Sequence, residues 1–156
     1  MTLQDGEPAP EFDLRADGGT EISTAALSGR PYVIYFYPRD DTPGCTKEAI
    51  GFTEAYPQFQ ELGVEVIGVS KDSISSHAKF RAKHGLCFPL GADEGGSVVE
   101  AFGAWIEKSM YGKKYMGVDR ATFLVDAHGR VARSWRAVKV PGHVEEVLAA
   151  ARQLKP

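Results

Sequence analysis

The feature that most constrains this chain is an apolar run that ends in a proline-rich loop and a cysteine. Residues 32–37 read YVIYFY, and residues 38–48 read PRDDTPGCTKE. The apolar run has no polar face, which is typical of a strand whose sheet is covered by helices on both sides. Pro43 suits the first turn of a helix, and helix formers follow Gly44. We therefore predict a buried strand, a short loop and a helix with Cys45 in its first turn.

Cys45 at this position has the surroundings of a reactive thiol. Unpaired backbone N–H groups and the positive end of the helix dipole favour the thiolate, which is the nucleophilic form. Pro38, Thr42 and Cys45 form the pattern P-x3-T-x2-C, in which the Thr42 hydroxyl can point at the sulfur or at a substrate oxygen. Pro38 stiffens the loop and limits access of water and large molecules. The alternative is a buried, inert cysteine after a turn, and the whole pattern favours the catalytic interpretation.

The string YFYPRDDTPGCTKEA at residues 35–49 resembles the peroxiredoxins, specifically the bacterioferritin comigratory protein or peroxiredoxin Q subfamily. Residues 6–14 resemble the opening of the peroxiredoxins, and residues 102–120 resemble a phrase of this subfamily, so the resemblance spans essentially the whole chain. The resemblance implies a thiol-dependent peroxidase in which Cys45 attacks the O–O bond of hydrogen peroxide or an organic hydroperoxide. A thioredoxin-type C-x-x-C dithiol is excluded, because Glu48 stands where its second cysteine would be.

The order of elements predicts a thioredoxin-like α/β fold, with a central mixed sheet flanked by helices and an N-terminal β-hairpin extension. A length of 156 residues with 43% hydrophobic content suits one domain, residues 1–156. The expected elements are an extended arm at 7–14 with a return strand at 21–22, the central strand at 32–37, a helix at 44–62, a strand at 64–70, a helix at 73–85, a short strand at 88–90, a helix at 97–102, a hairpin of 121–125 with 130–135, and a helix at 144–154. No propensity argument predicts the structure of residues 103–120.

Arg120 directly precedes a predicted strand, at the position where peroxiredoxins carry an arginine that faces the reactive sulfur. The resemblance implies that its guanidinium favours the thiolate and orients the peroxide oxygens. The alternative is a surface arginine paired with Asp119 or Asp126. Glu48, three residues after Cys45, can reach Arg120 or a backbone donor, or can simply be a first-turn acid that complements the helix dipole.

Cys87 is the only internal candidate for a resolving thiol. In the subfamily that the chain resembles, the commonest pattern has a second cysteine five residues after the reactive one, where this chain has Ile50. Cys87 stands at the entrance to a short apolar strand, which is typical of a buried cysteine that behaves as a small hydrophobe. We therefore favour reduction of Cys45 by an external thiol, with a Cys45–Cys87 disulfide as the alternative.

The other polar clusters predict no chemistry. Asp40 and Asp41 are interpreted as solvated turn formers, because carboxylates that faced a thiolate would disfavour it. The four histidines lack the spacing of a metal site, so no metal is expected. The glycine-containing stretch at residues 91–96 lacks the lysine of a phosphate loop, so no nucleotide or other cofactor is expected.

The charge and composition of the chain limit the kinds of molecule that it is expected to bind. A net charge of -3 without long basic or acidic blocks suggests neither nucleic acid nor a membrane surface. The first residues lack the features of an export signal, and two cysteines fit a reducing cytoplasm. The expected partners are a hydroperoxide and, from the resemblance, thioredoxin or a similar thiol reductant, with the chain acting as a monomer.

Two other functions remain open on the sequence alone. A cysteine–histidine hydrolase also places a thiolate at a helix N-terminus and needs only a distant histidine. A redox-sensing or holdase module would use Cys45 as a switch without turnover. Peroxide turnover with a thiol reductant separates a peroxidase from both.

Overall fold

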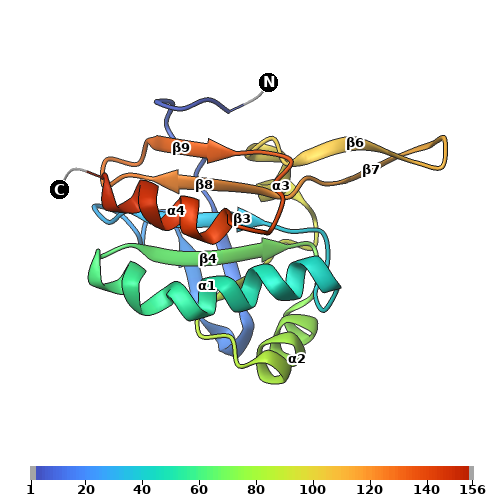
Figure 1. The fold of residues 1–156 in the computed structure, drawn as a ribbon, viewed down its shortest axis with the longest axis horizontal. Helices are drawn as coiled ribbons and strands as arrows, with labels where there is room; N and C mark the ends of the chain where they lie inside the picture. The colour runs from blue at the N-terminus through green and yellow to red at the C-terminus, as the bar shows by residue number, and fades with distance from the viewer. Residues whose placement is uncertain (1–2, 155–156) are drawn as a thin grey trace.

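A seven-stranded mixed sheet forms the centre of the computed structural model, which describes residues 3–154 (Figure 1). The strand order is β2-β1-β5-β4-β3-β8-β9, and a separate two-stranded sheet pairs β6 with β7. The elements are β1 (Asp13–Ala16), a 3-10 turn (Asp17–Gly19), β2 (Glu21–Ser23), β3 (Tyr32–Phe36), α1 (Pro43–Glu61), β4 (Glu65–Ser70), α2 (Ile74–His84), β5 (Leu90–Ala92), α3 (Ser97–Ala101), β6 (Trp105–Met110), β7 (Lys113–Val118), β8 (Ala121–Val125), β9 (Val131–Trp135) and α4 (His143–Arg152).

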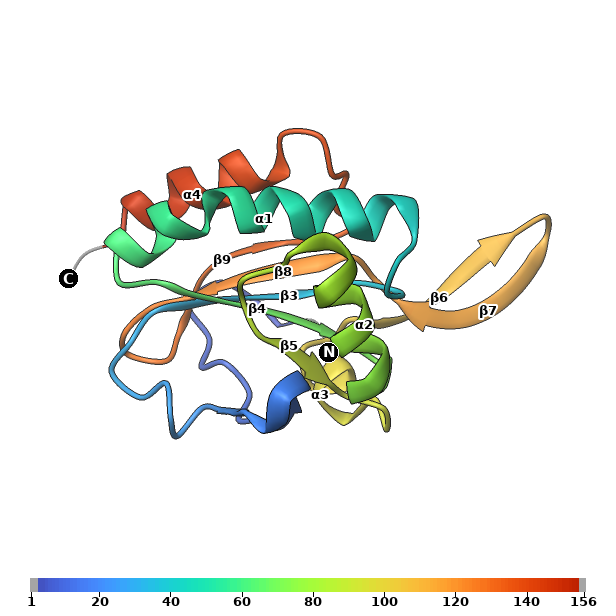
Figure 2. The ribbon, with the colours of Figure 1, turned by 90° about the horizontal axis from the view of Figure 1, so that it is seen from below.

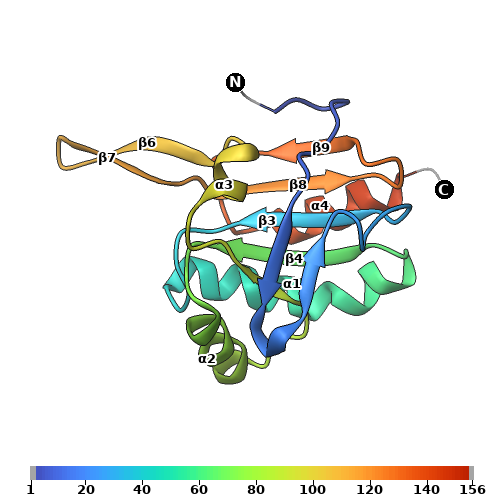
Figure 3. The ribbon, with the colours of Figure 1, turned by 180° about the vertical axis from the view of Figure 1, so that it is seen from behind.

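Helices α1 and α4 lie side by side on one face of the sheet (Figure 2). The β1–β2 hairpin and α3 lie toward the opposite face (Figure 3). The sheet therefore separates two apolar cores, as the strand at 32–37 predicted by having no polar face. Within residues 3–154, no helix is both long enough and apolar enough to cross a membrane.

Successive residues of β3 alternate between the two cores. Val33 and Tyr35 point into the core under α1 and α4, whereas Ile34 and Phe36 point into the other. All five residues of β3 are buried. The ring of Phe52 from α1 stacks on Tyr35, with ring centroids 4.7 Å apart and an interplanar angle of 20°. This stack holds α1 against the strand that precedes it.

The pairing of β3 with its neighbours positions the candidate active site. β3 runs parallel to β4 and antiparallel to β8, and Phe36 at its end pairs with Ala121 at the start of β8. The loop that leaves β3 therefore begins beside the residue that enters β8. That residue is Arg120, and the helix that the loop enters carries Cys45.

The predicted fold class is confirmed, and the element boundaries differ in few places. The short strand expected at 88–90 is observed two residues later, at Leu90–Ala92, because those residues pair with β4 and β1. Residues 105–118, for which there was no prediction, form the β6–β7 hairpin that projects from the body (Figure 1). The side chains of Met110, Tyr111, Tyr115 and Met116 on this hairpin are exposed.

We expect Phe52→Ala to lower the free energy of unfolding by about 3–5 kcal/mol, because Phe52 is fully buried and its loss leaves a cavity against Tyr35. Urea unfolding followed by circular dichroism measures the change. Tyr111→Ala is the control, since Tyr111 is 98% exposed and its truncation should change the free energy of unfolding by less than about 0.5 kcal/mol. Equal effects of the two substitutions would contradict the assignment of Phe52 to the core.

Candidate active site

Cys45 lies in the first turn of α1, as predicted. Thr42 is the N-cap residue, and its carbonyl accepts the N–H of Thr46 at 2.8 Å. Pro43 occupies the start of the helix, where its missing N–H costs no helical hydrogen bond. Its place in the first turn puts the Cys45 sulfur at the positive end of the α1 dipole. Because Cys45 is only 1% exposed, the sulfur has little contact with solvent.

Arg120 connects Cys45 to Glu48. The Arg120 Nη2 donates to the Cys45 Sγ at 3.4 Å, and the Arg120 Nη1 donates to the Glu48 Oε1 at 2.7 Å. The alternative in which Arg120 pairs with Asp119 or Asp126 is wrong, because Asp119 accepts the N–H of residue 137 and Asp126 accepts N–H groups of its own turn. Glu48 therefore contacts Arg120, which is one of the two roles that the sequence left open for it.

Burial sets the charge state of this cluster. The Glu48 side chain is 0% exposed, and burial raises its pKa to about 7 although the Arg120 charge opposes the shift. Among the described residues, the second carboxylate oxygen of Glu48 has no hydrogen-bond partner, which agrees with a raised pKa. Burial lowers the pKa of Arg120, but Glu48 and Cys45 raise it by more, so the guanidinium remains charged. A fixed cation thus faces the sulfur.

Gly44 allows the guanidinium to approach the helix. A Cβ atom at this position would lie 3.2 Å from the Nη2 of Arg120, which is tighter than an ordinary contact. That nitrogen is also the one that donates to Cys45. A larger residue at position 44 would therefore push the guanidinium away from the sulfur.

Thr42 and Pro38 belong to the loop, but neither makes the contact with sulfur that the sequence suggested for Thr42. The Thr42 hydroxyl donates to the Arg39 carbonyl at 2.9 Å, so its proton is used within the loop. Pro38 is exposed at the point where the chain leaves β3. Their roles toward a substrate stay predictions.

The interpretation of Asp40 as a solvated turn former was wrong. Asp40 is 8% exposed, and its carboxylate accepts hydrogen bonds from Tyr37, Ser76 and His77. Two of these partners lie more than 30 residues away in the chain, so no local pattern could have found them. Asp41 is exposed, as expected of a turn residue, and has a positive φ of 58°.

The description of Cys87 as a buried small hydrophobe was also wrong. Cys87 is exposed, and the following residue, Phe88, takes the buried position instead. The Cys87 thiol lies 3.7 Å from the carbonyl oxygen of Thr53 on α1. Because Thr53 follows Cys45 by eight helical residues, this carbonyl lies about 12 Å further along the helix. Both cysteines are free thiols.

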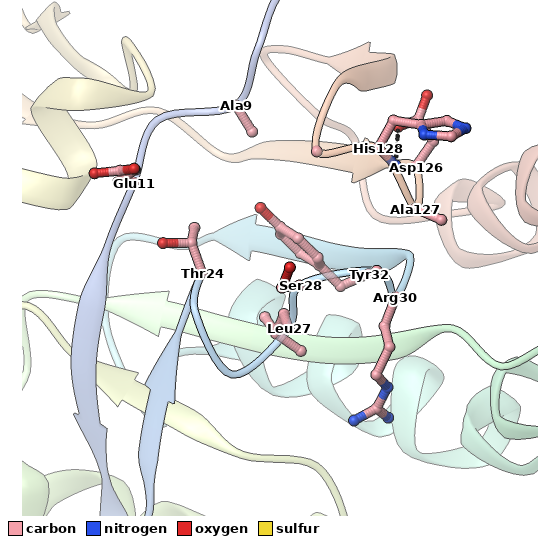
Figure 4. Close-up of a pocket in the computed structure, with 12 residues that line it drawn as sticks. Ala9, Glu11, Thr24, Leu27, Ser28, Arg30, Tyr32, Asp126, Ala127 and His128 are labelled. Carbon is pink, nitrogen blue, oxygen red and sulfur yellow. Dashed lines mark hydrogen bonds between the residues drawn. The ribbon is translucent and has the colours of Figure 1, made fainter.

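A cavity of about 240 Å³ lies away from this cluster (Figure 4). Tyr32, Arg30 and His128 are among its lining residues, at the amino end of β3, whereas Cys45 follows the carboxyl end. The cavity therefore has no part in chemistry at the sulfur. Residues 3–154 contain no group of three or more His, Cys, Asp or Glu side chains arranged to hold a metal ion.

A family model, related sequences and solved structures all relate the chain to the same group of proteins. A family model described as the AhpC/TSA family matches residues 6–134. Peroxiredoxin Bcp from Bacillus subtilis is 44% identical over 154 residues, which cover 99% of this chain and 98% of that protein. A structure of PrxQ from Xylella fastidiosa superposes with a TM-score of 0.92 at 37% identity and covers 97% of both chains. The Xanthomonas campestris bacterioferritin comigratory protein, described for alkyl peroxide reduction activity, superposes with a TM-score of 0.86 at 45% identity over 90% of both chains.

We expect Arg120→Met and Glu48→Gln to move the pH midpoint of Cys45 alkylation in opposite directions. Loss of the cation should raise the midpoint, whereas loss of the buried acid should lower it, because that acid competes for the guanidinium. Iodoacetamide labelling against pH, in a Cys87→Ser background, measures both shifts.

The control for this pair is Lys47→Met, which removes an exposed cation from the same helical turn and should move the midpoint little. General loosening of the site would shift both test variants in the same direction. A rise of the midpoint in Glu48→Gln would therefore contradict the charge balance described above.

Proposed function

The chain belongs to the AhpC/TSA family, among its Bcp and PrxQ peroxiredoxins, and is a thiol-dependent peroxidase; on this premise we propose that Cys45 is its peroxidatic nucleophile. The observation that carries the assignment is the Arg120 guanidinium, which contacts the Cys45 sulfur at a helix N-terminus. A structural cysteine has no need of a fixed cation and a helix dipole directed at its sulfur.

The proposed reaction uses Cys45 as a two-electron reductant. The thiolate attacks the terminal oxygen of a hydroperoxide, an S–O bond forms and the O–O bond breaks. The departing alkoxide or hydroxide takes up one proton, which balances the proton that the thiol lost, and leaves as alcohol or water. A second thiol then attacks the sulfur of the sulfenic acid, which releases water and forms a disulfide. Reduction of that disulfide by a further thiol restores Cys45.

Arg120 supports this reaction through its charge and its two donating edges. Negative charge moves from sulfur to the departing oxygen, and a fixed guanidinium beside the sulfur stabilises that charge throughout. Glu48 holds the guanidinium from the other side and fixes its orientation. Thr42 takes part if its hydroxyl exchanges the Arg39 carbonyl for a peroxide oxygen, and Pro38 shapes the loop around the sulfur.

The proposed substrates are hydrogen peroxide and organic hydroperoxides, which the alkyl peroxide reduction described for the Xanthomonas relative supports. The proposed reductant is thioredoxin or a similar protein thiol of the cytoplasm. We also propose that the chain is a single domain that acts as a monomer, because Cys45, Arg120 and Glu48 form a complete cluster within one chain. A cysteine–histidine hydrolase finds no support, because the partner of the sulfur is Arg120 and His77 bonds Asp40 instead.

Cys45→Ser should abolish peroxide turnover and leave the fold intact, since a serine hydroxyl is a far weaker nucleophile at neutral pH. The measurement is NADPH oxidation with thioredoxin, thioredoxin reductase and tert-butyl hydroperoxide, with circular dichroism to check folding. Cys87→Ser is the matched control and should keep turnover. Rapid oxidation of the parent protein without turnover under any thiol reductant would favour a redox sensor.

One equivalent of peroxide should convert Cys45 to sulfenic acid and leave Cys87 a free thiol, because about 12 Å of intact α1 separates the two. Dimedone trapping followed by mass spectrometry locates the sulfenic acid, and maleimide labelling counts the free thiols. A stoichiometric Cys45–Cys87 disulfide, together with lost turnover in Cys87→Ser, would instead identify Cys87 as the resolving cysteine.

A further inference from the structure

A buried polar network ties the loop before Cys45 to α2 and β5. The Asp40 side chain is 4% exposed and the His77 side chain is 0% exposed. One carboxylate oxygen of Asp40 accepts the Tyr37 hydroxyl at 2.6 Å. The other accepts the Ser76 hydroxyl at 2.7 Å and faces the Nδ1 of His77 at 2.8 Å. We call Tyr37, Asp40, Ser76 and His77 the Asp40 network.

The contacts of His77 define its protonation. Its Nδ1 faces a carboxylate, and its Nε2 lies 2.9 Å from the carbonyl oxygen of Gly91. Neither acceptor carries a hydrogen, so both ring nitrogens must donate and the ring is an imidazolium cation. Tyr37 is 3.4 Å from Nδ1, but its hydroxyl proton goes to Asp40 at the shorter distance of 2.6 Å. The network is therefore a buried ion pair with hydrogen bonds at both ends.

The carboxylate of Asp40 depends on this cation. Burial raises the pKa of Asp40, but hydrogen bonds from His77 and Tyr37 and the His77 charge lower it by more. A buried carboxylate without its cation is strongly disfavoured and moves toward water. Asp40 precedes Cys45 by five residues, so movement of Asp40 displaces the first turn of α1.

The other tie between this loop and α2 is exposed. Asp41 contacts Lys83 at 2.7 Å and His84 at 2.9 Å, and 43% of its side chain is accessible to solvent. Exposed pairs of this kind contribute little, since water and salt screen them. The backbone N–H of Asp40 also donates to the Asp72 carboxylate at 2.9 Å in a partly buried site. The loop is therefore held by this bond and by the buried pair of Asp40 with His77, and only the latter carries a buried cation.

We propose that His77 is a positioning residue of the peroxidase, whose charge holds Asp40 and residues 38–44 so that Cys45 lies beside Arg120. This inference rests on the proposed function of Cys45 and assigns a role to a histidine that makes no contact with the sulfur. The role is transmitted by the backbone of the loop, which leads from the carboxylate of Asp40 to the sulfur. His77 is therefore not a catalytic residue, because it does not contact the reacting atoms.

The test is His77→Gln, which keeps a side-chain donor near Asp40 but removes the charge. We expect the second-order rate of Cys45 oxidation by peroxide to fall about tenfold to a hundredfold, as small misplacements of reacting groups do. The alkylation midpoint of Cys45 should rise toward that of Arg120→Met. His84→Gln is the matched control, because it removes a histidine from the same helix that contacts the exposed Asp41, and both quantities should stay unchanged.

Two further variants separate positioning from general damage. Arg120→Met added to His77→Gln should raise the midpoint little further, because the single substitution has already separated sulfur from guanidinium. Asp40→Asn added to His77→Gln removes the orphaned carboxylate and should restore most of the peroxide rate. Additive midpoint shifts in the first pair, or no recovery in the second, would overturn the proposal.

If His77→Gln does not fold, Ser76→Ala is the second test, because it removes one hydrogen bond from Asp40 and leaves the ion pair. It should slow peroxide oxidation by a smaller factor, and an unchanged rate would count against the proposal. Nitrogen-15 NMR of the parent protein should show both His77 nitrogens protonated at neutral pH, and a neutral ring would overturn the proposal. Failure of Cys45 itself as nucleophile is detected separately, by turnover that survives Cys45→Ser.

Discussion

The antiparallel pairing of β3 with β8 is the constraint on which the site depends. Phe36 pairs with Ala121, so the loop that leads to Cys45 begins where Arg120 ends its own loop. Side chains 75 residues apart in the chain thereby meet across a single strand boundary. Because the side-chain period of a strand is two residues, a shift of one residue in this register would send Phe36 and its neighbours to the wrong cores. The packing of β3 thus protects the geometry of the thiol.

Burial makes the charges of the site depend on each other. Cys45, Glu48 and Arg120 form a set of two acids and one cation with little access to water. At this depth the cation stabilises an anion strongly, but only one of the two acids can receive its full effect. Burial raises the pKa of Glu48 to about 7 although the charge and hydrogen bond of Arg120 lower it, so the carboxylate is only partly ionised near neutral pH. The guanidinium is then available to the sulfur, and Glu48 still orients it.

The sequence predicted what depends on neighbouring residues and missed what depends on distant ones. The strand, the Pro43 helix start and the position of Cys45 follow from local patterns, and the structure agrees with them. Asp40 was read as solvated because its partners Ser76 and His77 lie on another helix. Cys87 was read as buried because its strand begins later than expected, which leaves the thiol outside. The resemblance supplied Arg120, since no spacing rule relates it to the cysteine.

Because Cys45 is almost fully buried, the two proposed half-reactions require different positions of the loop that holds it. A hydroperoxide is small enough to approach a sulfur that is 1% exposed, whereas a protein thiol needs the sulfur to come toward the surface. Local opening of the loop and first helical turn satisfies the second demand, and its free energy depends on the contacts that must break. The buried contacts of Asp40 with Ser76 and His77 are among these. If His77 positions the loop as proposed, a tighter Asp40–His77 pair would favour attack on peroxide and a looser one would favour reduction by a protein thiol, so the two halves of the proposed cycle place opposite requirements on the same contact.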